Sequence, residues 1–248
     1  FVIYYLSNNI NKKFFENLND SYLIIIFTIP ILIFRIFINS LKISSLLKIL
    51  NKKNESVKNI FKILLEAQLS LALPGSFIAS KAWIDSNLIK KFKFDLKEYY
   101  KFNLLILLFT FLIILFFILL KFYATLLLIG FILVFYLFYK NYINYFFYFF
   151  FYLINLLLNV SISFLVIYNL SPELLSDNII NIFFSSLISV YLDTFSFLPF
   201  NIGYSQTTYG LTFEFLSLSK DIAFTIASII QISQIIIVIF ITFFFFQK

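Results

Sequence analysis

Four stretches of this chain carry no charged residue and are close to the length needed to cross a lipid bilayer. They cover residues 102–120, 122–139, 141–172 and 222–247. A membrane-spanning helix takes about 20 mostly apolar residues. Only 12% of the residues are charged, against about 25% in a soluble domain. The sequence therefore predicts an all-α polytopic integral membrane protein, in which residues 1–248 form a single membrane domain.

The basic residues are concentrated in one part of the chain, and this orients it in the membrane. Residues 42–101 hold 12 of the 19 lysine and arginine residues. Positively charged loops stay on the cytoplasmic side, so this part is predicted to be cytoplasmic. The alternative is a dedicated patch for anionic lipid or nucleic acid. Because membrane loops carry this bias by default, we expect no nucleic-acid partner.

The residue types that are missing limit the chemistry. There is no cysteine and no histidine, which removes thiolate metal sites and the commonest metal ligand. We therefore assign no catalytic residue, no metal and no cofactor, and we expect a protein that is not an enzyme. The expected location is a bacterial inner (plasma) membrane.

The amino-terminal part holds one further span. The chain starts at Phe1 and contains no methionine, so residues 1–6 are interpreted as the tail of a lost helix. Residues 21–41 are predicted to cross the membrane, with Pro30 kinking the helix. Arg35 is expected about 10 Å from the lysine-rich end, close enough to snorkel to the cytoplasmic interface.

Residues 63–80 are apolar, but Pro74-Gly75 interrupts them. Only 14 uncharged residues separate Glu66 from Lys81. They reach about 21 Å as a helix, against a hydrocarbon core of about 30 Å. Both flanks are rich in lysine and favour the same side of the membrane. The pattern predicts a re-entrant hairpin that enters from the cytoplasm, and a short kinked span is the alternative.

A second broken segment, residues 193–210, contains Pro199, which follows Pro74 by 125 residues. Two such segments at matching places in the halves of a chain point to inverted repeats and a site near the bilayer midplane. Counting spans outward from the cytoplasmic part puts residues 171–177 outside, so this hairpin enters from the outer face. Residues 81–101, which mix aromatic residues with lysines, are predicted to form an interfacial helix.

The sequence thus predicts about six to eight transmembrane helices and two opposed Pro/Gly-broken re-entrant segments, and it leaves an inverted repeat open. Three motifs carry a resemblance to a known family. They are "IFRIFINSLK" (33–42), "LALPGSFIASKAWI" (71–84) and "FLPFNIGYSQTTYGLTFEFLSLSKDIAFTIASII" (197–230). In this order and spacing they resemble the lysylphosphatidylglycerol synthase transmembrane region, also called the flippase-like domain family.

The resemblance implies an integral membrane flippase-like protein that binds or translocates a lipid or lipid-linked substrate between leaflets. The partners expected from it are membrane lipids, anionic or polyprenyl-linked, and the oligomeric state is left open. The sequence departs from the family at charged positions. Gln206 stands where the family has a glutamate, and Gln231 or Gln234 stands in place of an arginine in the final span.

Asp193 is the strongest single candidate for a functional residue, because it is the one charged residue between positions 178 and 213. A carboxylate in a membrane segment is costly and therefore points to function. The alternatives are a carboxylate near the interface or one paired with a lysine. The candidate ligand or cavity residues are Pro74, Gly75, Lys81, Asp193, Pro199, Asn201, Gly203, Gln206, Gln231 and Gln234, with Arg35 as an interfacial residue.

Several polar residues have a simpler interpretation. Asn155 and Asn159 share one helix face, as do Gln231 and Gln234, and hydrogen bonds between packed helices explain such pairs. Two other functions stay open. A membrane-embedded glycosyl- or acyltransferase would have to use Glu173 and Asp177, the only carboxylates of the predicted outer loop. An accessory subunit of a larger membrane complex is the other alternative.

Overall fold

A computed structural model describes residues 12, 14, 16–17, 22–51, 56–72, 76–92, 97, 99–100, 104, 143–193 and 201–246. Throughout these residues the regular structure is helical, without a strand. The elements are α3 (Tyr22–Asn51), α4 (Val57–Ala67), the 3₁₀-helix η1 (Gln68–Ala72), α5 (Ser76–Phe92), α8 (Ile143–Leu170), α9 (Pro172–Asp193), α10 (Tyr204–Phe215) and α11 (Lys220–Phe246).

Among the described residues, four helices are long and apolar enough to cross a membrane. They cover Leu23–Leu50, Phe150–Leu170, Pro172–Asp193 and Lys220–Phe243. For these residues the prediction of an all-α protein with helices that can span a membrane is confirmed. The predicted spans at 102–120 and 122–139 and the predicted helix tail at 1–6 lie outside the described residues, so the count of six to eight stays a prediction.

The helix α3 is longer than the predicted span of 21–41. Its last ten residues carry lysines and are still helical. In this part of the helix, Ser45 Oγ donates to the carbonyl of Leu41, one turn earlier, at 3.0 Å. Leu46 and Leu47 on these turns are fully buried. Pro30 lies inside the helix, which continues past it. The lysine-rich end of α3 is therefore packed helix rather than loop.

In the predicted broken segment at 63–80, the α-helix ends at Ala67. The amphipathic helix α4 buries Ile60, Ile63, Leu64 and Ala67, and the chain tightens into η1 before α5 begins at Ser76. The helices α4 and α5 pack against each other. Pro74 and Gly75 lie outside the described residues. The helix α5 runs without a break from Ser76 to Phe92, so it includes the end of the predicted broken segment and the start of the predicted interfacial helix.

The loop predicted at 171–177 is wrong as to conformation, because these residues are helical after Ser171, whereas their position outside the membrane stays a prediction. The helix α9 starts at Pro172, whose fixed backbone angle suits the first helical position and whose missing N–H costs nothing there. Glu173 in the first turn complements the helix dipole. A kink at Asn178 (φ −132°, ψ 24°) separates these polar turns from the apolar remainder of α9.

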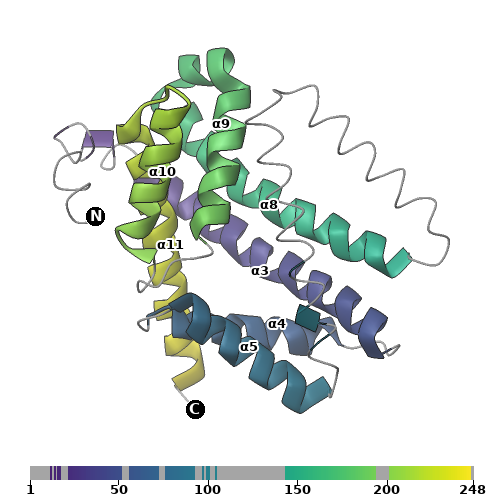
Figure 1. Cartoon of the computed structure of the whole chain (residues 1–248). Coiled ribbons are helices and arrows are strands. Elements are labelled where there is room, and N and C mark those ends of the chain that lie inside the picture. The colour runs from purple at the N-terminus through teal and green to yellow at the C-terminus, as the bar shows by residue number, and fades with distance from the viewer. Residues whose placement is uncertain are drawn as a thin grey trace.

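The helices α9, α10 and α11 stand side by side, and α3 runs alongside α8 (Figure 1). One apolar cluster lies where α3 starts and α8 ends, and it includes Ile24, Val166, Ile182, Phe213 and Ile222. Another lies at the lysine-rich end and includes Leu47, Ile60, Leu64, Leu88 and Tyr148. These two clusters belong to opposite ends of α3, and a third apolar cluster, with Leu32, Ile162, Ile237 and Ile241, lies between them.

Candidate functional site

One face of α9 carries Ser185, Ser189 and Asp193, each four residues from the next. Residues at this spacing lie above one another on a helix. The face packs against α10, where Ser189 and Thr212 share a hydrogen bond of 2.5 Å between their hydroxyl oxygens. Small hydroxyl residues allow close approach of helices and hold them together inside a membrane. This spacing therefore brings Asp193 against the first turns of α10.

The Asp193 carboxylate is held by two hydroxyl groups of α10. Ser205 Oγ donates to one carboxylate oxygen at 2.8 Å, and Thr208 Oγ1 donates to the other at 2.7 Å. Asp193 itself is half-buried. Within the described part of the chain it makes no ion pair. Among the described residues, the side-chain partners of this carboxylate are thus two neutral hydroxyl groups.

Two glutamines hold the start of α10 against α11. Gln206 Nε2 donates to Gln231 Oε1 at 2.7 Å, and Gln231 Nε2 donates to Gln206 Oε1 at 3.1 Å and to the Asn201 carbonyl at 2.9 Å. The backbone N–H of Gly203 donates to Gln206 Oε1 at 2.8 Å. Asn201 (φ 58°) and Gly203 (φ 78°) adopt the left-handed conformation that this turn requires. The turn at 201–203 is therefore fixed to α11.

The position of Gln231 fixes the level of this turn along α11. Gln231 follows Lys220 by 11 residues, about 17 Å along the helix. The hydrocarbon core of a bilayer is about 30 Å thick, and the candidate span runs from Lys220 to Phe243. The turn therefore lies level with the middle of that span.

Arg35 lies at a similar level on the other side of the bundle. Its guanidinium donates to the side-chain oxygen of Asn159 on α8, and Asn159 Nδ2 donates to the Asn155 carbonyl at 3.1 Å. Asn159 stands near the centre of the candidate span Phe150–Leu170. The sequence predicts that Arg35 snorkels to the cytoplasmic interface. In the structure its side chain contacts Asn159 of α8, and the interfacial position stays a prediction.

Tyr209 connects the two sides. It is fully buried on α10 and packs in one apolar cluster with Val166 and Ile167 of α8, about two turns beyond Asn159. Polar side chains from five helices thus gather in one part of the bundle. We call this set the polar layer, and its members are Arg35, Asn159, Asp193, Ser205, Gln206, Thr208, Tyr209, Ser228 and Gln231.

The structure brings together five of the candidate residues predicted from the sequence, namely Asp193, Asn201, Gly203, Gln206 and Gln231. Gln234 lies one turn further along α11 and makes no side-chain hydrogen bond within the described part of the chain. Lys81 is placed on α5, but its side chain lies outside what the structure describes, as do Pro74, Gly75 and Pro199.

The hydroxyl partners of Asp193 were not among the candidates. Ser205, Thr208 and Tyr209 sit in a stretch that looks like an ordinary polar turn in the sequence, "GYSQTTYG". The signal that could have found them is the four-residue spacing of Ser185, Ser189 and Asp193, because it defines a polar face that needs a polar partner helix.

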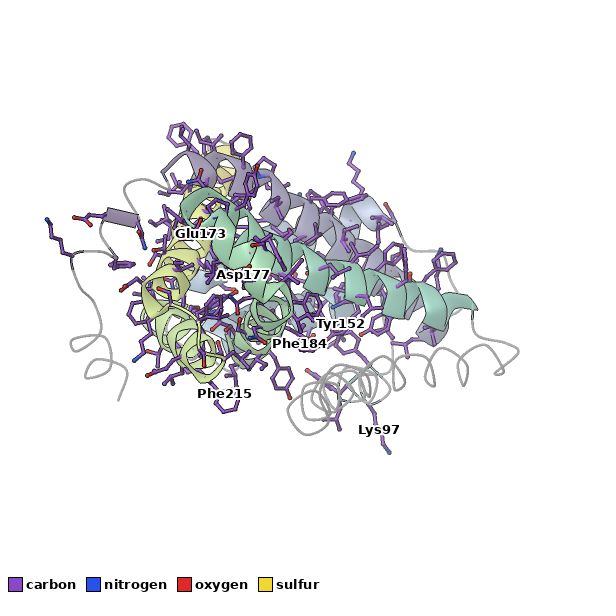
Figure 2. All side chains as sticks on the ribbon, turned by 90° about the horizontal axis from the view of Figure 1, so that it is seen from above. Lys97, Tyr152, Glu173, Asp177, Phe184 and Phe215 are labelled. Atoms are coloured by element: carbon purple, nitrogen blue, oxygen red, sulfur yellow. The ribbon has the colours of Figure 1, made fainter. Side chains whose placement is uncertain are left out.

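Glu173 and Asp177, the carboxylates required by the transferase alternative, lie on the first two turns of α9 (Figure 2), whereas Asp193 is its last residue. Both are exposed, and Ser176 Oγ donates to Asp177 Oδ1 at 3.0 Å. Among the described residues there is no group of three or more side chains that could hold a metal ion. The helix dipole explains the place of Glu173 in the first turn of α9.

No protein-family model, no curated protein and no solved structure matches this chain. The resemblance to the flippase-like family therefore stays a prediction based on the motifs in the sequence.

Proposed function

We propose that this chain is an integral membrane protein of the bacterial inner membrane that binds or translocates a lipid or lipid-linked substrate between leaflets. The observation that carries the proposal is the polar layer, and above all the Asp193 carboxylate at the level of Gln231. A charged group at the centre of a membrane helix costs about 2.5–3.5 kcal/mol. Such a cost is typical of substrate or ion pathways.

The two broken segments support the proposal because both contact α11. The turn at 201–203 binds Gln231, near the middle of this helix. From the other broken segment, η1 packs on α11, and Leu65 and Leu69 belong to an apolar cluster with Ile237 and Ile241. Figure 1 shows α4 and α5 near the C-terminal end of α11. Broken helices that meet near the midplane form the substrate sites of many transporters.

The lengths of the helices favour a re-entrant hairpin made by α9 and α10. The helix α10 has 12 residues and reaches about 18 Å, too short to cross the hydrocarbon core. It ends beside the start of α11, where Glu214 and Lys220 form an ion pair of 2.6 Å. The start of α10 lies beside Asp193, the last residue of α9. The end of α9 therefore lies one length of α10, about 18 Å, from the Glu214–Lys220 ion pair. We infer that α9, although long enough to span, stops near the midplane.

Reconstitution tests the proposal directly. Purified protein in liposomes is expected to speed the exchange of a fluorescent acyl-labelled phospholipid between leaflets, and Asp193→Asn is expected to slow it. Asp177→Asn is the matched control, because it removes an exposed carboxylate from the same helix. Exchange no faster than in protein-free liposomes, together with no lipid retained on purification, would show that the proposal is wrong.

A further inference from the structure

Arg35 and Asp193 carry opposite charges in the polar layer, yet they do not form a salt bridge. Arg35 donates to the neutral Asn159, and Asp193 accepts from the neutral Ser205 and Thr208. Within the described part of the chain neither side chain makes an ion pair. Asn159, the partner of Arg35, lies on α8, and Tyr209 of α10, next to Thr208, packs against the same helix. The layer therefore holds a cation and an anion, each of which contacts a neutral partner.

Both charged groups have hydrogen-bonding capacity to spare. A guanidinium has five N–H donors, and the described contact of Arg35 uses one of them, toward Asn159. A carboxylate has about four acceptor positions, and Ser205 and Thr208 occupy two of those on Asp193. Neither side chain is fully buried. A ligand could thus bind either group without displacing its protein partner.

We propose that the polar layer binds the headgroup of a zwitterionic phospholipid with a primary amine, its phosphate at Arg35 and its ammonium at Asp193. The proposal rests on the function proposed above and names the substrate class. Arginine pairs with phosphate oxygens in a planar, bidentate geometry. A primary ammonium has three N–H donors for the carboxylate.

Charge balance favours this headgroup over the alternatives. An uncompensated charge inside a protein is strongly unfavourable. A headgroup with both signs neutralises Arg35 and Asp193 together. A purely anionic headgroup would neutralise Arg35 and bring a second negative charge toward Asp193, whereas a purely cationic one would leave Arg35 uncompensated. A quaternary amine carries the right charge but has no N–H to donate to Asp193.

The test is leaflet exchange of three acyl-labelled probes in liposomes that contain the full chain. The probes are phosphatidylethanolamine, phosphatidylcholine and phosphatidylglycerol. We expect the ethanolamine lipid to exchange about tenfold faster than the glycerol lipid, because a hydrogen bond to a charged group contributes about 1.5–3 kcal/mol and 1.4 kcal/mol is a factor of ten. Asp193→Asn should bring the ethanolamine rate down to the choline rate, while Asp193→Glu should keep the order of the probes.

Asp177→Asn, on the exposed part of α9, is expected to leave all three rates unchanged. Mass spectrometry of copurified lipids gives a second readout, in which wild type should enrich the ethanolamine lipid over the host membrane and Asp193→Asn should not. Equal exchange of the three probes by wild type, or an equal slowing of all three by Asp193→Asn, would overturn the headgroup proposal and leave lipid exchange standing. No exchange of any probe would overturn both proposals.

Discussion

Gln206 of α10 and Gln231 of α11 exchange hydrogen bonds between their side-chain amides, at 2.7 and 3.1 Å. Gln231 is buried, and it also holds the carbonyl of Asn201. Because Gln231 lies near the middle of α11, this pair fixes the start of α10 at that level of α11. A single pair of amides thus positions the polar layer relative to a candidate membrane span.

Replacing Gln231 by leucine is predicted to destabilise the protein. The change leaves the Gln206 amide and the Asn201 carbonyl without this partner, and an unsatisfied buried polar group costs about 1–3 kcal/mol. Gln234→Leu is the control, since Gln234 makes no side-chain hydrogen bond within the described part of α11. Thermal unfolding in detergent should show a clearly lower Tm for Gln231→Leu than for Gln234→Leu. Equal Tm values for both variants would contradict the role given to Gln231.

Replacing Asn159 by leucine is predicted to leave the Arg35 guanidinium without its amide partner. A hydrogen bond to a charged group contributes about 1.5–3 kcal/mol, so the free energy of unfolding should fall by about that much. Asn155→Leu is the matched control one turn away, because the Asn159 side chain uses only the backbone carbonyl of Asn155. Chemical denaturation in mixed micelles measures both changes. If Asn155→Leu is as costly as Asn159→Leu, the interaction with Arg35 has little energetic weight.

Tyr100 and Asp85 give a prediction about pH. The Tyr100 hydroxyl donates to Asp85 Oδ2 at 2.5 Å, and this hydrogen bond, together with burial and the nearby negative charge, raises the pKa of Tyr100 to about 12. Folding therefore favours the protonated phenol. Its stabilising effect is complete below the ordinary pKa of about 10 and is lost as the pH rises through the folded value.

Ultraviolet difference titration of wild type against Tyr100→Phe isolates this one tyrosine among the 16 in the chain. The missing ionisation step should fall near pH 12. In an Asp85→Asn background the same difference should move toward the ordinary range, because the charged acceptor is gone. A Tyr100 step near pH 10 in the wild-type background would refute the interaction.

How much the sequence could predict differs between apolar and polar features. The span at 150–170 follows from hydrophobic length, and it has a counterpart in the candidate span Phe150–Leu170. The break predicted at Pro74-Gly75 lies outside the described residues. Helix continuity was harder to predict. Residues 171–177 look like a polar loop, but Pro172 and Glu173 are also good helix-starting residues, and here they start α9.

The sequence predicts only some of the residues that form hydrogen bonds in the polar layer. Asp193 stands out because it is the lone charge in a long apolar stretch. Its partners Ser205 and Thr208 do not, since hydroxyl residues are common in turns and at helix starts. Arg35 near a lysine-rich end is typical of a snorkelling residue, and only the packing of α3 against α8 turns it toward Asn159. Such contacts depend on which helices meet, which one sequence does not state.

The central claim is that α9 and α10 form a hairpin that enters the membrane from one face and returns to it. The chain has no cysteine, so single cysteines can be introduced without removing any. Four exposed positions report on the claim. They are Ser86 on α5, Ser176 on α9, Ile202 in the turn before α10, and Ser217 between α10 and α11.

Labelling of these single cysteines with a membrane-impermeant thiol reagent, applied to each face in turn, is the most direct test. Ser176→Cys and Ser217→Cys are predicted to react from the same, outer face, and Ser86→Cys only from the cytoplasmic face. Ile202→Cys should react slowly, and only from the outer face, because the turn lies about 17 Å deep along α11. Rapid reaction of Ile202→Cys from the cytoplasmic face, at the rate of Ser86→Cys, would show that α9 crosses the membrane and that the polar layer is not at the midplane.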